Sequence, residues 1–241
     1  MGGTIFEKNS ANLRFPDLNL IRPDIDALIF DLDGTILDSM TLWNQVDIEF
    51  LSKRGFEVTH DYTEYVKRVS IDNAALYTKE RFNLKESPEE IKNEWNKMVF
   101  DAYLNSVKIF DGVFEYIKDA ANMGYKIAAA TALNRVNAEA ALKSNGIYDF
   151  FSCLITLEDL GTHVDKSTPD VYLLTSESIN VAPSRCLIFE DVEIAIKGAI
   201  LGGFKTTAVY DSIGAGSSTS WENMCAISDY QIGKWGIYSK G

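Results

Sequence analysis

The sequence predicts an α/β protein in which a parallel sheet is covered by helices on both faces and an additional helical unit is inserted. Short apolar runs rich in strand-forming residues alternate along the chain with segments of helical length. These runs are continuously hydrophobic, which is typical of strands that are buried on both faces. One long interval shows only helical patterns, and 241 residues are enough for a core with one such insertion.

Five apolar runs are predicted to form the strands of the sheet. They are Ala27 to Phe30, Lys126 to Ala130, Cys153 to Thr156, Cys186 to Phe189, and Thr206 to Tyr210. Helices are expected between them, including one over Ala132 to Lys143 that closes at Asn145-Gly146 and one that opens at Thr168-Pro169. Asn-Gly favours the end of a helix, and proline favours its first turn.

The inserted helical unit is predicted over residues 39–110, which leaves residues 1–38 and 111–241 for the α/β core. Within the core, residues 1–24 form an N-terminal extension to which the sequence assigns no role. Residues 212–220 are rich in serine and glycine, so they are predicted to form a surface loop.

Two helices of the insertion have clear sequence signals. The first ends in the basic pair Lys53-Arg54 followed by Gly55, a favourable helix end, and the second begins at Ser87-Pro88-Glu89-Glu90 with a capping box. The faces expected to be buried are Trp43, Val46, Phe50 and Leu51 on the first helix, and Ile91, Trp95, Met98 and Ala102 on the second.

Composition excludes several classes of partner. A net charge of -12 would repel the phosphates of nucleic acid, and no cluster of basic residues offsets it. The apolar stretch from Ile127 to Leu133 is too short to cross a bilayer, and Met1 to Ser10 lacks a signal-like segment. Three widely spaced cysteines indicate neither a disulfide framework nor a zinc site. We therefore expect a cytoplasmic monomer that binds neither nucleic acid nor membranes.

Asp31 and Asp33 stand directly after the first predicted strand, where residues of a parallel sheet face the ligand crevice. If the chain bends at Gly34, both carboxylates can reach one small volume, where their repulsion requires a cation or a shared proton. Mg²⁺, which takes oxygen ligands and also binds phosphate oxygens, satisfies that requirement. The alternative is that Asp33 or Asp38 only caps a helix.

Further polar residues follow other predicted strands. Glu190 and Asp191 come after the strand that ends at Phe189 and supply two more carboxylates at the same edge of the sheet. Thr131 follows another strand and offers a hydroxyl and backbone N–H groups near a helix start, which suits an anion. Lys166 precedes a helix start and offers a positive charge to a phosphate or a carboxylate. Each has a simpler interpretation alone, but their joint occurrence favours a catalytic site.

From Ala27 to Tyr210 the chain resembles the haloacid dehalogenase-like superfamily, in its branch of phosphatases and β-phosphoglucomutase-like proteins with a helical cap. The four family motifs are matched in order by Asp31, Asp33 and Thr35; by Thr131; by Lys166 with Pro169-Asp170; and by Glu190-Asp191. The resemblance implies a Rossmann-like core with a helical cap. Ser167, Val192 and Ala195 depart from the usual family residues, which puts the loop geometry in doubt.

The resemblance also implies a role for each acidic residue. Asp31 would attack phosphorus and form an aspartyl phosphate, and Asp33 would donate a proton to the leaving oxygen and later take one from water. Asp31, the backbone carbonyl of Asp33, and Asp191 would hold Mg²⁺, with Glu190 bound directly or through a neighbouring ligand.

Phosphate and substrate contacts are implied in the same way. Thr131, Ala132 and Lys166 would bind the phosphoryl oxygens of a small phosphorylated metabolite, with a sugar phosphate as one candidate. In the cap, residues 66–71 resemble the loop by which β-phosphoglucomutases hold a sugar phosphate, so Lys67 and Ser70 are candidate substrate contacts.

Three functions remain open at this point. A phosphatase is favoured over a phosphomutase, because Ile71 and Trp43 replace the arginine and histidine that the resemblance leads one to expect in a mutase. Both residues can also be explained by packing within the cap. A binding protein without turnover is the third possibility, although a retired site has no physical reason to keep crowded carboxylates.

Overall fold

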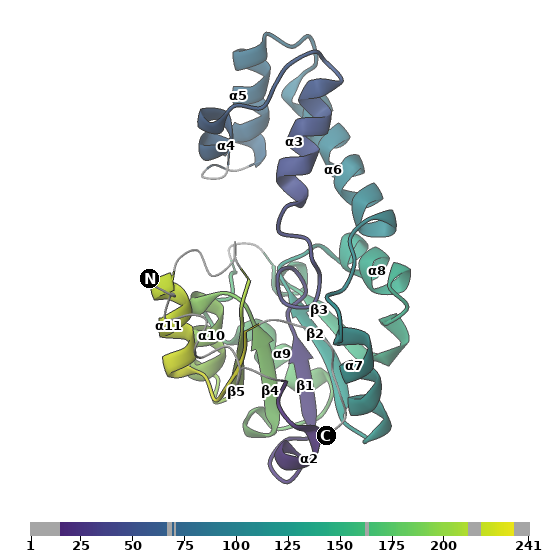
Figure 1. The fold of residues 1–241 in the computed structure, drawn as a ribbon, viewed down its shortest axis with the longest axis vertical. Helices are drawn as coiled ribbons and strands as arrows, with labels where there is room; N and C mark the ends of the chain where they lie inside the picture. The colour runs from purple at the N-terminus through teal and green to yellow at the C-terminus, as the bar shows by residue number, and fades with distance from the viewer. Residues whose placement is uncertain (1–14, 67–68, 70, 162–163, 212–217, 234–241) are drawn as a thin grey trace, which may run out of the picture. The chain divides into compact units, whose positions relative to one another are not determined.

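The computed structural model describes residues 15–66, 69, 71–161, 164–211 and 218–233. The chain forms two compact units, one made of residues 1–40 with 108–241 and one made of residues 41–107 (Figure 1). Backbone hydrogen bonds from Asp38 to Lys108 and from Phe110 to Ile36 tie the two connecting segments together, so the ends of the predicted insertion lie in the core unit. In the described part of the chain no helix has both the length and the apolar character needed to cross a membrane.

The core unit contains a six-stranded parallel sheet in the order β3-β2-β1-β4-β5-β6. The strands are β1 (Ala27–Phe30), β2 (Lys126–Thr131), β3 (Phe151–Thr156), β4 (Cys186–Glu190), β5 (Lys205–Val209) and β6 (Tyr230–Ile232). This confirms the predicted α/β fold class and the five predicted strands. The sixth strand was missed, because its three residues include a central glutamine and form no apolar run.

Helices cover both faces of the sheet, as the continuous apolar strands require. The core helices are α2 (Leu18–Ile21), α7 (Val113–Asn122), α8 (Arg135–Ser144), α9 (Asp170–Ser178), α10 (Glu193–Leu201) and α11 (Ser218–Ile227). Ala27, Ile29 and Ile188 pack in one cluster with Tyr172 of α9. On the opposite face, the ring of Phe189 contacts Tyr116 of α7 with centroids 6.1 Å apart. Residues 218–220, predicted as loop, belong to α11.

The N-terminal extension packs against the core through the residues that the structure describes. Leu18 and Ile21 of α2 are buried, and the hydroxyl of Tyr116 donates a 3.0 Å hydrogen bond to the carbonyl oxygen of Pro16. This part of the extension is therefore an element of the core, which sequence patterns did not predict.

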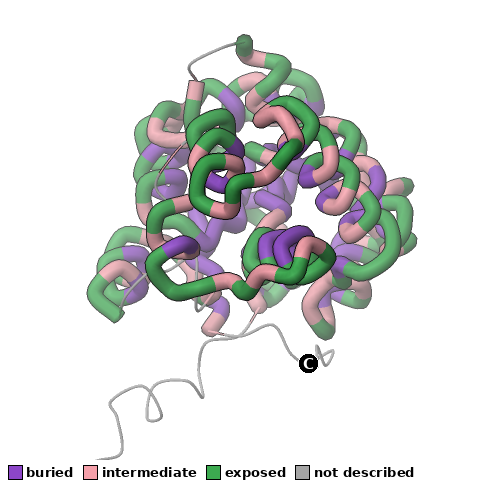
Figure 2. The backbone as a smooth tube through the Cα atoms, turned by 90° about the horizontal axis from the view of Figure 1, so that it is seen from above, coloured by how far each residue is buried: buried purple, intermediate pink, exposed green. Residues whose placement is uncertain are grey.

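The cap unit consists of α3 (Leu42–Ser52), α4 (His60–Val66), α5 (Ile71–Phe82) and α6 (Pro88–Asn105), with no strand in its described residues. Along these helices buried and exposed positions alternate (Figure 2). Gly55 has the positive φ expected after α3, and α6 begins with the predicted capping box at Ser87 and Glu90.

Two details of the predicted cap core were wrong. Trp43 is 48% exposed, and Leu42 is buried in its place four residues before Val46. On α6 the buried stripe continues from Trp95 in steps of four to Val99 and Tyr103, and the predicted Met98 and Ala102 are only half-buried. In both helices the prediction spaced two buried residues three positions apart, whereas the structure spaces them four apart. Residues three and four positions away lie on nearly the same helix face, so the sequence pattern does not separate them.

Candidate active site

Three carboxylates meet at the carboxyl ends of the two central strands. Asp31 follows β1, Glu190 ends β4, and Asp191 follows it; the pairing of Phe30 with Phe189 aligns the two strand ends. One ligand oxygen from each of the three lies within 4.8 Å of the others, and all three residues are buried. The structure thus brings together three of the residues predicted to bind metal.

Burial and mutual repulsion make this acidic cluster costly when it is fully ionised. Burial raises the pKa of Glu190 to about 7. The positive charge of Lys166 acts to lower this pKa, and the negative charge of Asp31 acts to raise it further. Burial, followed by the charges of Asp31 and Glu190, raises the pKa of Asp191 well above its usual range. The cluster therefore favours either protons or added positive charge.

Lys166 supplies one positive charge to the cluster. Its ammonium donates hydrogen bonds to Oδ1 of Asp31 and, at 2.6 Å, to Oε1 of Glu190. Burial alone would lower the pKa of Lys166, but the charges of Asp31 and Glu190 outweigh it and raise that pKa. The predicted cation is thus in the site, but one ammonium does not balance three carboxylates.

Asp191 carries the clearest sign of a missing positive partner. Its Oδ1 accepts a 3.0 Å hydrogen bond from the hydroxyl of Thr35, whereas its buried Oδ2 has no hydrogen-bond partner in the part of the chain that the structure describes. A buried carboxylate oxygen without a partner is expensive, and a metal ion would satisfy it. The oxygen ligands of this cluster suit a hard divalent cation such as Mg²⁺.

Gly34 lets Asp191 approach the turn after β1. Its φ is +75°, and a Cβ at this position would lie 2.3 Å from Oδ2 of Asp191. Any side chain would therefore collide with the oxygen that lacks a partner, so the predicted bend at Gly34 also makes room for the cluster.

Asp33 follows Asp31 by two residues in sequence but does not belong to the cluster of three carboxylates. It is half-buried, and Ser39 donates a 2.6 Å hydrogen bond to its Oδ1. Asp33 is predicted to bind the metal through its backbone carbonyl oxygen rather than its carboxylate, and this stays a prediction.

Thr131 is the last residue of β2 and is buried, and its Oγ1 accepts a 3.1 Å hydrogen bond from the backbone N–H of Leu133. Ala132 is exposed in the turn that follows. The next helix was predicted to start at Ala132 but starts at Arg135, because the side chain of Asn134 caps it. The N–H groups near Thr131 therefore belong to a turn rather than to a helix start.

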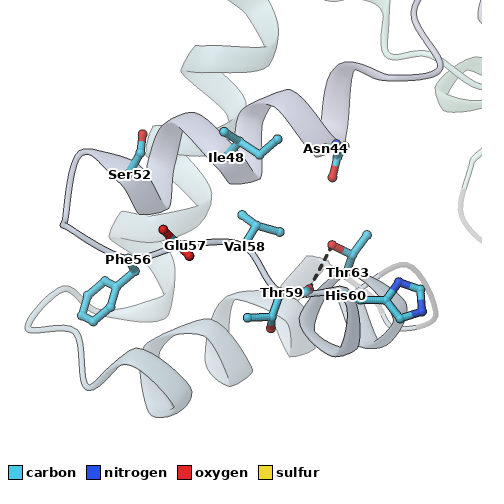
Figure 3. A pocket seen from close by; sticks show the side chains of 9 residues that line it. All are labelled: Asn44, Ile48, Ser52, Phe56, Glu57, Val58, Thr59, His60 and Thr63. Atoms are coloured by element: carbon cyan, nitrogen blue, oxygen red, sulfur yellow. Dashed lines mark hydrogen bonds between the residues drawn. The ribbon is translucent and has the colours of Figure 1, made fainter.

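The other predicted contacts are in the cap. Lys67 and Ser70 lie outside the described residues. A pocket of about 560 Å³ lies between α3 and the segment that leads into α4 (Figure 3). Its lining residues are Asn44, Ile48, Ser52, Phe56, Glu57, Val58, Thr59, His60 and Thr63. Among the described residues this lining includes a carboxylate and neither lysine nor arginine, so it offers no permanent positive charge to a phosphate group, and the acidic cluster remains the candidate site.

One residue at the cluster was missed by sequence reasoning. The hydroxyl of Tyr172, on α9, donates a 2.7 Å hydrogen bond to Oε1 of Glu190. Tyr172 stands in the apolar run Val171–Leu174, which gives no signal of a polar contact, so only the structure could reveal it.

Comparisons with known proteins agree with this geometry. A model of the haloacid dehalogenase-like hydrolase family matches residues 28–209. The chain is 29% identical to YhcW of Bacillus subtilis over 177 residues, covering 73% of this chain and 78% of that one. It is 26% identical to the phosphorylated carbohydrates phosphatase of Thermotoga maritima over 184 residues, covering 75% and 83% of the two chains.

A solved structure supports the fold. CbbY from Rhodobacter sphaeroides, determined in complex with phosphate, superposes with a TM-score of 0.67 at 18% identity and covers 87% of this chain and 94% of that one. Because the family model spans most of the sequence, including all four matched motifs, the chain is an enzyme of the haloacid dehalogenase-like hydrolase family.

Proposed function

We propose that this enzyme is a Mg²⁺-dependent phosphomonoester hydrolase that acts on a small phosphorylated metabolite through an aspartyl phosphate. The observation that carries the proposal is the buried cluster of Asp31, Glu190 and Asp191. Among the described residues, Lys166 is the one cation paired with this cluster, and Oδ2 of Asp191 has no hydrogen-bond partner. The names of relatives such as the phosphorylated carbohydrates phosphatase favour a sugar phosphate as the substrate.

Asp31 is the nucleophile in this proposal. One of its carboxylate oxygens attacks phosphorus, the bond from phosphorus to the leaving oxygen breaks, and Asp33 donates a proton to that oxygen. Water then attacks phosphorus, Asp33 takes its proton, and phosphate leaves with Asp31 restored. The 2.6 Å hydrogen bond from Ser39 fixes one oxygen of Asp33 for this exchange.

Asp31, Glu190 and Asp191 would hold Mg²⁺ together with the backbone carbonyl of Asp33. The ion, when bound, would offset negative charge on the transferring phosphoryl group. Lys166, Thr131 and the backbone N–H of Ala132 would bind the remaining phosphoryl oxygens. Lys67 and Ser70 stay candidates for contact with the leaving group.

Hydrolysis remains favoured over phosphoryl transfer between two positions of a sugar. Trp43 is 48% exposed and Ile71 is 38% exposed, so burial in the cap core does not account for either residue. Ile71 has no polar side-chain atom with which to bind a second phosphate, and the indole N–H of Trp43 cannot accept a proton from a sugar hydroxyl, as a mutase requires. Isomerisation of sugar 1- and 6-phosphates that depends on a bisphosphate primer would favour the mutase instead.

The test is phosphate release from a panel of phosphate esters, with and without EDTA, by the wild-type chain and by Asp31→Asn and Asp33→Asn. We expect Mg²⁺-dependent release that either substitution abolishes while the far-UV spectrum is retained. Asp38→Asn is the matched control, because Asp38 lies in the same loop with an exposed side chain. Undiminished release by Asp31→Asn or Asp33→Asn would refute the assigned roles, and retained Mg²⁺ binding without turnover of any ester would support a binding protein.

A further inference from the structure

Tyr172 presents its hydroxyl to the acidic cluster from the hydrophobic core. Its side chain is fully buried on α9, and its ring contacts Phe204 at a tilted, edge-on angle with centroids 6.0 Å apart. The hydroxyl donates a 2.7 Å hydrogen bond to Oε1 of Glu190. Packing therefore fixes the ring and, with it, the direction of the hydrogen bond.

The same oxygen of Glu190 accepts a second hydrogen bond. Lys166 donates to Oε1 at 2.6 Å while it also donates to Asp31. Both donors come from one short stretch of chain, the turn before α9 and the first turns of that helix. Two side chains of this stretch therefore donate hydrogen bonds to the same oxygen of Glu190.

Two donors restrict a carboxylate more than one does. With a single flexible donor such as lysine, a glutamate side chain can turn about its own bonds and carry the donor along. The tyrosine ring cannot follow, so it sets the rotation of the carboxylate. Lys166 is then held where it reaches Asp31 as well as Glu190.

We propose that Tyr172 is a positioning residue that fixes the carboxylate of Glu190 and thereby keeps the oxygens of Asp31, Glu190 and Asp191 arranged for a divalent cation. The inference rests on the proposed function and adds a residue that no motif of the sequence marks. Removing a residue that orients a metal ligand typically weakens metal binding by about 10–100-fold. We expect an effect in this range when the hydroxyl of Tyr172 is removed.

The experiment compares Tyr172→Phe with Tyr116→Phe in the full chain. Tyr116 is also fully buried in the core unit, but its ring packs against Phe189 on the face of the sheet opposite to Tyr172, and its hydroxyl donates to the carbonyl oxygen of Pro16 at 3.0 Å. Each substitution keeps the ring and removes one buried hydrogen bond, so the two variants should be destabilised to a similar extent. Mg²⁺ binding to the free protein is measured by calorimetry, and phosphate release is measured as a function of Mg²⁺ and of ester concentration.

For Tyr172→Phe we expect a Mg²⁺ dissociation constant raised about tenfold or more, with the KM for the ester changed less than twofold at saturating Mg²⁺. For Tyr116→Phe we expect both constants within twofold of wild type. Equal Mg²⁺ affinity in wild type and Tyr172→Phe, or an equal loss in both variants, would overturn the role of Tyr172 while leaving the proposed hydrolase intact. A wild-type chain that neither binds Mg²⁺ nor releases phosphate would overturn both.

Discussion

Replacing Asp47 by asparagine should stabilise the cap at neutral and alkaline pH. Asp47 lies on α3 with 8% of its surface exposed, and its Oδ1 accepts a 3.1 Å hydrogen bond from the hydroxyl of Tyr62. That hydroxyl lies 3.0 Å from Oγ1 of Thr78. Burial raises the pKa of Asp47 from 3.8 to about 6, and the hydrogen bond from Tyr62 offsets only part of this effect.

The direction of the pH dependence follows from the raised pKa. Between about pH 4 and pH 6 the folded chain holds a proton on Asp47 that the unfolded chain has released, so the free energy of unfolding falls as pH rises through this range. At about 1.4 kcal/mol per pKa unit, ionised Asp47 costs the fold about 3 kcal/mol above this window. Asparagine keeps the acceptor oxygen and removes the charge, but it buries amide donors at a cost of about 1 kcal/mol. Asp47→Asn should therefore raise the free energy of unfolding by about 2 kcal/mol at pH 8 and lower it by about 1 kcal/mol at pH 4.

The assay is hydrogen exchange of the α3 amides in the full chain, measured by mass spectrometry at pH 4, 6 and 8 after correction for the intrinsic exchange rate. Asp61→Asn is the control in the same unit, because Asp61 is exposed and its hydrogen bond from Arg81 lowers its pKa to about 2. That variant should lose stability at pH 8, the opposite sign. An effect of Asp47→Asn that is the same at pH 4 and pH 8 would refute the reasoning.

Three further predictions concern the acidic cluster. Mg²⁺ at about 100 times its dissociation constant should stabilise the wild-type chain by about 2.7 kcal/mol and raise its Tm. Asp191→Asn should abolish this rise in Tm. Equal rises in both proteins would contradict the metal site. Lys166→Met should lower kcat/KM by about 100-fold or more, because it removes the charged donor to Asp31. Lys197→Met is the control, because Lys197 forms an exposed ion pair with Glu193, and it should leave kcat/KM unchanged. Similar losses in both variants would show that the position of Lys166 is unimportant. Gly34→Ala and Gly203→Ala both place alanine at a positive φ, but only Gly34→Ala puts a Cβ near Asp191. Only Gly34→Ala should therefore weaken Mg²⁺ binding, measured by calorimetry. Unchanged Mg²⁺ binding in Gly34→Ala would disprove the close approach of Asp191 to this turn.

Much of the core could be predicted because burial on both faces leaves a continuous apolar run. Strand β1 was predicted with the bounds that the structure shows, Ala27–Phe30. The ends of β2 and β4 were placed one residue short, because Thr131 and Glu190 are polar and look like the first residues of a loop. Strand β6 was not predicted, because it lies at the edge of the sheet, where a strand does not need a continuous run of apolar residues.

The candidate site was predictable to the extent that its residues stand at strand ends. A parallel sheet brings such ends to one edge, so Asp31 and Asp191 could be brought together from 160 positions apart without any knowledge of side-chain conformation. The contact of Tyr172 could not be anticipated, because it depends on the rotation of α9 about its axis. The same limit explains Trp43, since helical periodicity alone does not distinguish it from Leu42 at the edge of a buried face.

The central claim, that Asp31 becomes phosphorylated, is tested most directly in Asp33→Asn with p-nitrophenyl phosphate and Mg²⁺. This ester has a leaving group that needs no proton, so the first step should proceed, whereas the second lacks the base that activates water. Acid quenching followed by peptide mass mapping should then find one phosphoryl group on the peptide that contains Asp31, and none in Asp31→Asn. Release of p-nitrophenol with no phosphoryl group on that peptide, or with the group on another residue, would contradict the account.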